Sequence, residues 1–329
     1  MSDYRQDPLA GEEDLQELFA SAGRRPEVPP EDLAAIQAAA RREWEEVVAA
    51  GRTRSRFVPL ALAASLLLAL TVFWWRRTEA PPPAPPPVAT VELVKDGSLA
   101  TKVGDALAPG APLATGEDGR VALRLAGGES VRLDAGTRVR LVSGTRLDLE
   151  AGAVYVDSGR PAGGGALEIR TSLGSVREVG TRFEVRLESG GEVALRVRVR
   201  EGAVSLLRRG GAEPVAAGEE LRLRRDGAVS RGTVAPYGPA WDWVTAAAPG
   251  LDLDGLTLRR YLDWVSRETG KRIRYEDEAL AGQAAEIRLH GSTTGMTPEE
   301  SVSVVLPGSG LGYRIAGGTL LVERIRAPR

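Results

Sequence analysis

The sequence predicts a multidomain protein with a short α-helical N-terminal part, one transmembrane helix, an all-β domain and a small α+β domain near its C-terminal end. Three observations lead to this fold class. The run from Phe57 to Trp75 is apolar and contains no charged residue. Between residues 89 and 225, apolar and polar residues alternate in short stretches, with turn residues at intervals of about ten residues. From residue 250 to 325, helix and strand patterns follow one another.

Residues 1–56 are expected to form two helices separated by a proline-rich break. The first helix would present Leu15, Leu18 and Phe19 on one face, and the second would run from Glu31 to about Ala50. A region of this length buries little surface by itself. The apolar stripe of the second helix is therefore predicted to bind a partner protein. The alternative is that the two helices pack on each other or extend the next helix. The predicted contact residues are Leu33, Ile36, Trp44 and Val47.

The apolar run at residues 57–75 has the length of a membrane span. At about 1.5 Å per residue, a helix of this length nearly matches a hydrocarbon core of about 30 Å. Arginines before the run outnumber those directly after it, which favours a cytoplasmic N-terminus. We therefore expect a single-pass inner-membrane protein whose C-terminal domains are periplasmic. Residues 76–88 form a proline-rich linker, which is predicted to be a stiff spacer.

Residues 89–232 are predicted to form an all-β sandwich or roll of short strands. The stretch VALRL from Val121 to Leu125 shows the alternation, and it recurs in the arginine-rich stretch near residue 198. The alternation places Arg196, Arg198 and Arg200 on the solvent face. No aromatic residue is interleaved with these arginines and the net charge of the chain is −2, so a nucleic-acid partner is not expected.

The segment LGSVREVGTRFEVR, from Leu173 to Arg186, resembles the central signature of the FecR (ferric citrate regulator) family. The phrases TGEDGRVALRL, VRLDAGTRVRL and AGAVYVDSG, in this order, support the resemblance. The resemblance implies structural roles and no catalytic group: turn or bulge positions for the glycines and core positions for the apolar residues. The signature residues are Gly174, Val176, Gly180, Thr181 and Phe183.

Residues 250–325 are predicted to form a small domain with a βαββαββ order. Thr257 and Thr297 are the expected N-caps of its two helices, with Gly270 at the end of the first and Pro298 at the start of the second. The order is similar to that of the short N-terminal domain of secretins and TonB-dependent receptors.

The sequence offers little for catalysis or cofactor binding. It contains no cysteine, and His290 is its single histidine, so a transition-metal site lacks ligands. The stretch from Asp252 to Gly255 lacks the later ligands of a calcium loop. We expect no enzyme activity, no metal and no cofactor.

Two hypotheses for function follow. The resemblance to the FecR family implies a single-pass signal transducer that regulates an extracytoplasmic-function sigma factor. Its signal would come from an outer-membrane TonB-dependent receptor or another envelope protein, recognised by the last domain at an exposed strand edge. The alternative is a membrane-anchored periplasmic scaffold or binding protein with no sigma partner.

Overall fold

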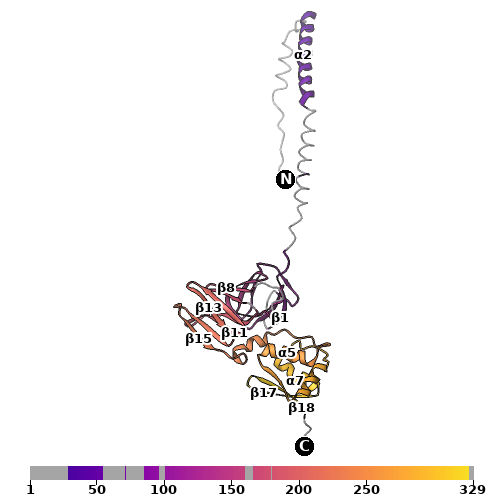
Figure 1. The fold of residues 1–329 in the computed structure, drawn as a ribbon. Coiled ribbons are helices and arrows are strands. Elements are labelled where there is room, and N and C mark those ends of the chain that lie inside the picture. The colour runs from indigo at the N-terminus through magenta and orange to yellow at the C-terminus, as the bar shows by residue number, and fades with distance from the viewer. Residues whose placement is uncertain are drawn as a thin grey trace, which may run out of the picture. The chain divides into compact units, whose positions relative to one another are not determined.

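The computed structural model describes residues 29–54, 71, 85–95, 101–159, 166–178 and 180–325, and the chain divides into two units, 1–84 and 85–329 (Figure 1). In the first unit the described element is the helix α2 (Pro30–Arg54). Glu31 and Asp32 lie in its first turn, where the positive end of the helix dipole stabilises negative charge. The predicted helix with Leu15 and its neighbours lies outside the described residues.

The structure corrects the predicted fold class and localisation. Strands are the predominant secondary structure of the described residues, and none of their helices is both long enough and apolar enough to cross a membrane. The helix α2 has the length, but acidic and basic side chains recur along it, which a lipid environment does not tolerate. The single-pass inner-membrane arrangement is therefore not supported. The run from Phe57 to Trp75, on which it depended, lies outside the described residues except for Thr71, as do residues 76–84 of the linker.

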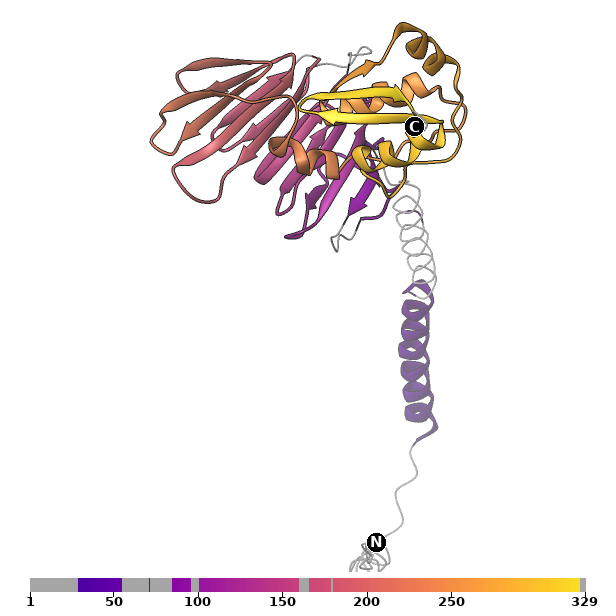
Figure 2. The same ribbon diagram turned by 90° about the horizontal axis from the view of Figure 1, so that it is seen from below.

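The second unit begins with a β domain (Figures 1 and 2). Its described strands are β1 (Ala89–Lys95), β2 (Ala106–Leu107), β3 (Pro112–Ala114), β4 (Arg120–Leu125), β5 (Ser130–Leu133), β6 (Arg138–Ser143), β7 (Arg146–Asp157), β8 (Glu168–Thr171), β9 (Gly174–Glu178), β10 (Arg182–Leu187), β11 (Val193–Glu201), β12 (Ala203–Arg208), β13 (Gly211–Ala216), β14 (Glu219–Arg224) and β15 (Val229–Thr233).

The long strand β7 connects two sheets. Its first half pairs with β6 and β8, in the order β3-β6-β7-β8-β9-β12-β13. Its second half pairs with β5 and β10, in the order β2-β1-β4-β5-β7-β10-β11-β14-β15. The change falls at Gly152, whose φ is +80°, and a Cβ there would lie 2.5 Å from Thr137 Cα. Only glycine adopts this positive φ without strain and leaves room for the backbone of Thr137. Gly152 therefore allows β7 to turn from one sheet into the other.

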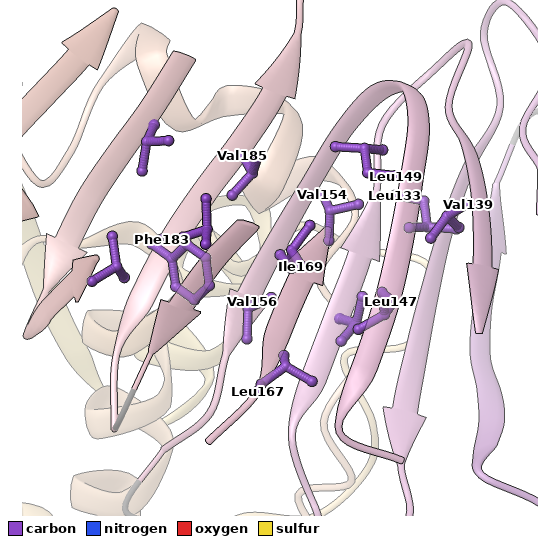
Figure 3. Close-up of a cluster of buried hydrophobic side chains, with 14 of the residues drawn as sticks. Leu133, Val139, Leu147, Leu149, Val154, Val156, Leu167, Ile169, Phe183 and Val185 are labelled. Carbon is purple, nitrogen blue, oxygen red and sulfur yellow. The ribbon is translucent and has the colours of Figure 1, made fainter. Parts of the chain in front are cut away.

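The core of the β domain lies between the two sheets. Figure 3 shows Val154, Ile169, Phe183 and Val185 among side chains that point into this space. All four are completely buried. Because the side chains of a strand alternate between its two faces, one face of each sheet supplies this core.

The segment after β15 covers part of the outer face of the second sheet. It contains the 3₁₀ helix η1 (Pro239–Trp241) and the helix α4 (Asp242–Ala246). Trp241 and Val244 are buried there and pack with Tyr155 of β7. The rings of Tyr155 and Trp241 meet edge to face, with centroids 6.0 Å apart.

The last part of the chain is a small α+β domain. Its elements are α5 (Leu258–Thr269), β16 (Arg272–Tyr275), α6 (Glu278–Glu286), α7 (Pro298–Gly308), β17 (Leu311–Ala316) and β18 (Thr319–Arg324). The strands form a sheet in the order β16-β18-β17, in which β16 is parallel to β18. The predicted N-caps are confirmed: the hydroxyl of Thr257 accepts from Arg260 N, and Thr297 forms a capping box with Glu300. The helix α6 was missed, and the third strand of the predicted βαββαββ order, at residues 287–289, is reduced to an isolated bridge between Thr257 and Arg288.

Candidate functional site

The helix α2 carries the four residues predicted to bind a partner. The exposed fractions of Leu33, Ile36, Trp44 and Val47 are 49%, 65%, 69% and 67%. At about 100° per residue the four positions fall within an arc of about 80°. The four residues therefore form one exposed apolar face, which we call the α2 face.

Apart from Val48, which is half-buried, the rest of α2 is polar or small. Arg42 lies opposite the α2 face on the helical wheel, and its Nε donates to Ala38 O at 3.3 Å. Exposed aromatic and branched side chains gathered on one side of a charged helix are typical of a protein-binding surface, because water contact with them is unfavourable. Trp44 has the most exposed large hydrophobic side chain in the described part of the chain, and it lies on the α2 face.

The signature residues lie inside the β domain. Gly174 starts β9 with a φ of +148°, and a Cβ there would lie 2.6 Å from Leu207 O of the neighbouring strand β12. Val176 and Phe183 are completely buried in the core. The signature is therefore used to pack β9 and β10 closely between their neighbours.

The turn between β9 and β10 is held by a buried polar cluster. The amide N of Thr181 donates to Ser158 Oγ at 2.7 Å, and Thr181 Oγ1 donates to Glu178 Oε2 at 2.8 Å. Ser158 Oγ donates to the same carboxylate oxygen at 2.9 Å. Gly180, with a φ of +69°, lies in this turn, and Val179 lies outside the described residues. Thr181 N also lies 3.1 Å from Glu178 Oε2, so this oxygen accepts three hydrogen bonds and the cluster fixes the turn.

The arginines of β11 are not on a solvent face, which corrects the prediction from the alternation. Arg200 is buried with a residue exposure of 6%, and the Arg196 and Arg198 side chains are exposed by 22% and 16%. Part of the outer face of this sheet is covered by η1, α4 and α5, and Arg200 Nη1 donates to Glu268 O of α5 at 3.0 Å. Periodicity identifies the two faces of a strand but not what covers them.

Beneath this cover lies a buried ion pair between the β domain and the last domain. Arg132 Nη2 of β5 lies 2.6 Å from Glu268 Oε2 of α5, and the two side chains are exposed by 2% and 8%. Arg132 Nη1 donates to Val244 O of α4 at 2.8 Å. Burial opposes the charge on Arg132, but Glu268, together with Tyr155 and Asp157, outweighs burial and raises the pKa of Arg132. Burial of the Tyr155 ring beside this pair raises the pKa of its hydroxyl.

A second ion pair joins the same two domains. Arg267 donates to both oxygens of Asp157, through Nε at 2.6 Å and Nη2 at 2.8 Å. Arg182 Nε lies 3.5 Å from the same carboxylate. Burial opposes ionisation of Asp157, but the hydrogen bonds and charge of Arg267, with Arg182, lower the pKa of Asp157 below its ordinary value.

These interdomain residues were missed from the sequence. Arg267 and Glu268 sit at the end of an amphipathic helix, where charged residues are ordinarily solvated. The two tryptophans of PAWDW (residues 239–243) could have indicated this interface. Two large rings in a short loop are expected to pack against another part of the protein.

The described residues contain no group of three or more His, Cys, Asp or Glu side chains placed to hold a metal ion. His290 is on the surface, with its side chain 81% exposed and Nδ1 3.7 Å from Asp254 Oδ1.

Residues 111–205 match the family of the FecR protein, which confirms the resemblance inferred from the signature for this part of the chain. No curated protein matches the chain. Two crystal structures of a candidate anti-sigma factor from Parabacteroides distasonis are similar, with 16% and 17% sequence identity. Each likeness covers 66% of this chain and 100% or 99% of the other, with a TM-score of 0.36, which is too low to carry an argument. The similarity of the last domain to the short N-terminal domain of secretins and TonB-dependent receptors stays a prediction.

Proposed function

We propose that this chain regulates an extracytoplasmic-function sigma factor, which it binds through the α2 face. The observation that carries the proposal is the FecR match over residues 111–205, because sigma-factor regulation is the role that this family resemblance implies. The exposed apolar side of α2 supplies a surface on which a helix-in-groove contact could form.

The chemistry of the α2 face fits an anchor contact. Trp44 offers a large ring with few rotamers to fix, and Ile36 and Val47 are stiff, branched side chains. Interfaces draw most of their affinity from a few such residues, and losing a central tryptophan costs about 2 kcal/mol or more. At about 1.4 kcal/mol for each tenfold change, this corresponds to an affinity about 30-fold lower.

The test is a calorimetric titration of the full chain with each extracytoplasmic-function sigma factor of the host. We expect one sigma factor to bind, Trp44→Ala to weaken binding about 30-fold, and Val47→Ala to weaken it by a smaller factor. Val304→Ala is the matched control, because Val304 is 55% exposed on α7 and does not belong to the α2 face. Circular dichroism checks that the variants keep their helix.

The proposal fails if no sigma factor binds, or if Trp44→Ala and Val304→Ala leave the affinity equally unchanged. In that case the alternative, a binding scaffold with no sigma partner, would be preferred.

For the signal we propose an outer-membrane TonB-dependent receptor or another envelope protein, bound at the edge of β17. Among the described residues β17 pairs with β18 alone, so one edge of this strand is open, and Ile315 on it is 43% exposed. Ile315→Lys should then weaken pull-down of the receptor's periplasmic domain by the chain, with Val304→Lys as the control. Equal capture by both variants would contradict this part of the proposal.

A further inference from the structure

One end of the β domain contains a hollow lined by arginines. Its volume is about 540 Å³. Three hairpin tips form it: the β8–β9 turn at Ser172, the β12–β13 turn at Arg209, and the β14–β15 turn at Arg225. Loops at the end of a sandwich are a common place for binding sites, because the sheets hold them rigidly.

The lining of this hollow is strongly basic. Arg208, Arg209, Arg224 and Arg225 line it, and among the described residues that line it there is no carboxylate. Leu223 also lines it and is buried, so part of the wall is apolar, which strengthens electrostatic contacts.

Two of the four guanidinium groups are neutralised at the rim. Arg208 Nη2 lies 3.2 Å from Glu213 Oε1, and Arg224 Nη2 lies 2.9 Å from Glu192 Oε2. Even so, their Nε atoms are buried and make no hydrogen bond, although Arg224 Nε is 3.5 Å from Asp226 Oδ2. These Nε atoms have no exposed surface, so a ligand in the hollow would be bound by the outer nitrogens of the guanidinium groups.

The other two arginines supply positive charge that no acid offsets. Arg225 is held in place by the protein backbone, since its Nε donates to Gly191 O at 2.9 Å and its Nη2 to Glu188 O at 3.1 Å. Both partners are neutral carbonyls, so the charge of Arg225 remains available. Arg209 is exposed, and no ion pair is found for it within the described residues.

We propose that this hollow, which we call the arginine hollow, binds a phosphate group. Guanidinium groups match the geometry of phosphate oxygens, and a phosphate carries enough charge to offset Arg209 and Arg225 together. The phosphate could be free or belong to a lipid headgroup, and the two sources share this chemistry. The inference does not depend on the sigma-factor proposal, because it concerns a different part of the chain.

The experiment uses the full chain and two probes. The first is a calorimetric titration with inorganic phosphate, and the second is co-sedimentation with phosphatidylcholine vesicles with and without phosphatidic acid. Arg209→Gln removes one charge and no ion pair, and we expect it to weaken binding about tenfold. Arg260→Gln is the matched control, because Arg260 is also exposed and lies on α5. We also expect binding to weaken as salt is raised.

The two arms separate the sources. Binding of inorganic phosphate that is sensitive to Arg209→Gln supports a free phosphate, and binding to the phosphatidic-acid vesicles alone, with the same sensitivity, supports a lipid headgroup. Absence of both kinds of binding would overturn the inference, as would equal loss with Arg260→Gln. A glutamate-rich peptide that binds more tightly than phosphate would also overturn it, because the ligand would then be a carboxylate.

Discussion

The buried ion pair between Arg132 and Glu268 should stabilise the unit formed by the β domain and the last domain against unfolding. The perturbation is Glu268→Gln, which keeps the shape of the side chain and removes its charge. In the wild type the two charges are 2.6 Å apart, and their side chains are exposed by only 2% and 8%. Breaking a buried pair by removing one charge costs about 3–5 kcal/mol, because the other charge stays buried without compensation.

The loss should lie near the lower end of this range. The amide of glutamine can still accept a hydrogen bond, and Arg132 Nη1 keeps its contact with Val244 O at 2.8 Å. We therefore expect the free energy of unfolding to fall by about 3 kcal/mol. For a unit of this size, this corresponds to a midpoint about 6–12 °C lower.

The assay is differential scanning calorimetry of the full chain, with urea unfolding followed by tryptophan fluorescence. Glu323→Gln is the control, because the pair between Arg314 and Glu323 is exposed and its loss should leave the midpoint unchanged. The reasoning would be refuted if Glu268→Gln left the midpoint where Glu323→Gln leaves it.

Two further predictions concern pH and backbone conformation. The folded pKa of Asp157 is lowered by its pairing with Arg267, so the pair stabilises the fold above about pH 4 and the contribution is lost as the pH falls through the folded pKa. Asp157→Asn should therefore lower the urea midpoint at neutral pH, and the difference from the wild type should shrink below about pH 4; a constant difference would contradict the assignment. Gly174→Ala should cost about 3 kcal/mol of unfolding free energy, since the added Cβ meets Leu207 O at 2.6 Å, whereas Gly104→Ala, at a φ of +92° in open space, should cost about 1 kcal/mol. Equal losses of unfolding free energy in urea for the two variants would mean that the close approach of β9 to β12 does not add to the cost of Gly174→Ala.

The elements that the sequence predicted well are those controlled by local rules. The hydroxyls of Thr257 and Thr297 cap their helices because the capping geometry involves only a few neighbouring residues. The burial of Val176 and Phe183 follows from the alternation of a strand between core and outer face.

The features that could not be predicted from the sequence depend on packing between residues far apart in the chain. Arg200 alternates like a solvent-facing residue, but a segment about forty residues later in the chain covers it. The pairs of Arg132 with Glu268 and of Asp157 with Arg267 join residues far apart in sequence, which no local pattern records. The arginine hollow likewise forms from three hairpin tips that only the fold brings together.

The membrane prediction failed for a different reason. It was drawn from the length and apolar character of residues 57–75 and from the arginines on either side, but no helix among the described residues meets the length and apolarity that a span requires. The helix α2 is the longest described helix, and it carries charged residues in its first turn and again from Arg41 onward.

The most direct test of sigma-factor regulation is transcription in the host from the promoters of the sigma factor that binds the chain. Transcripts would be compared in cells with the wild-type chain, a deletion of the chain, Trp44→Ala and Val304→Ala. We predict that Trp44→Ala changes transcription in the same direction as the deletion, while Val304→Ala matches the wild type. Transcription that is the same in the deletion and in the wild type would contradict the proposed function.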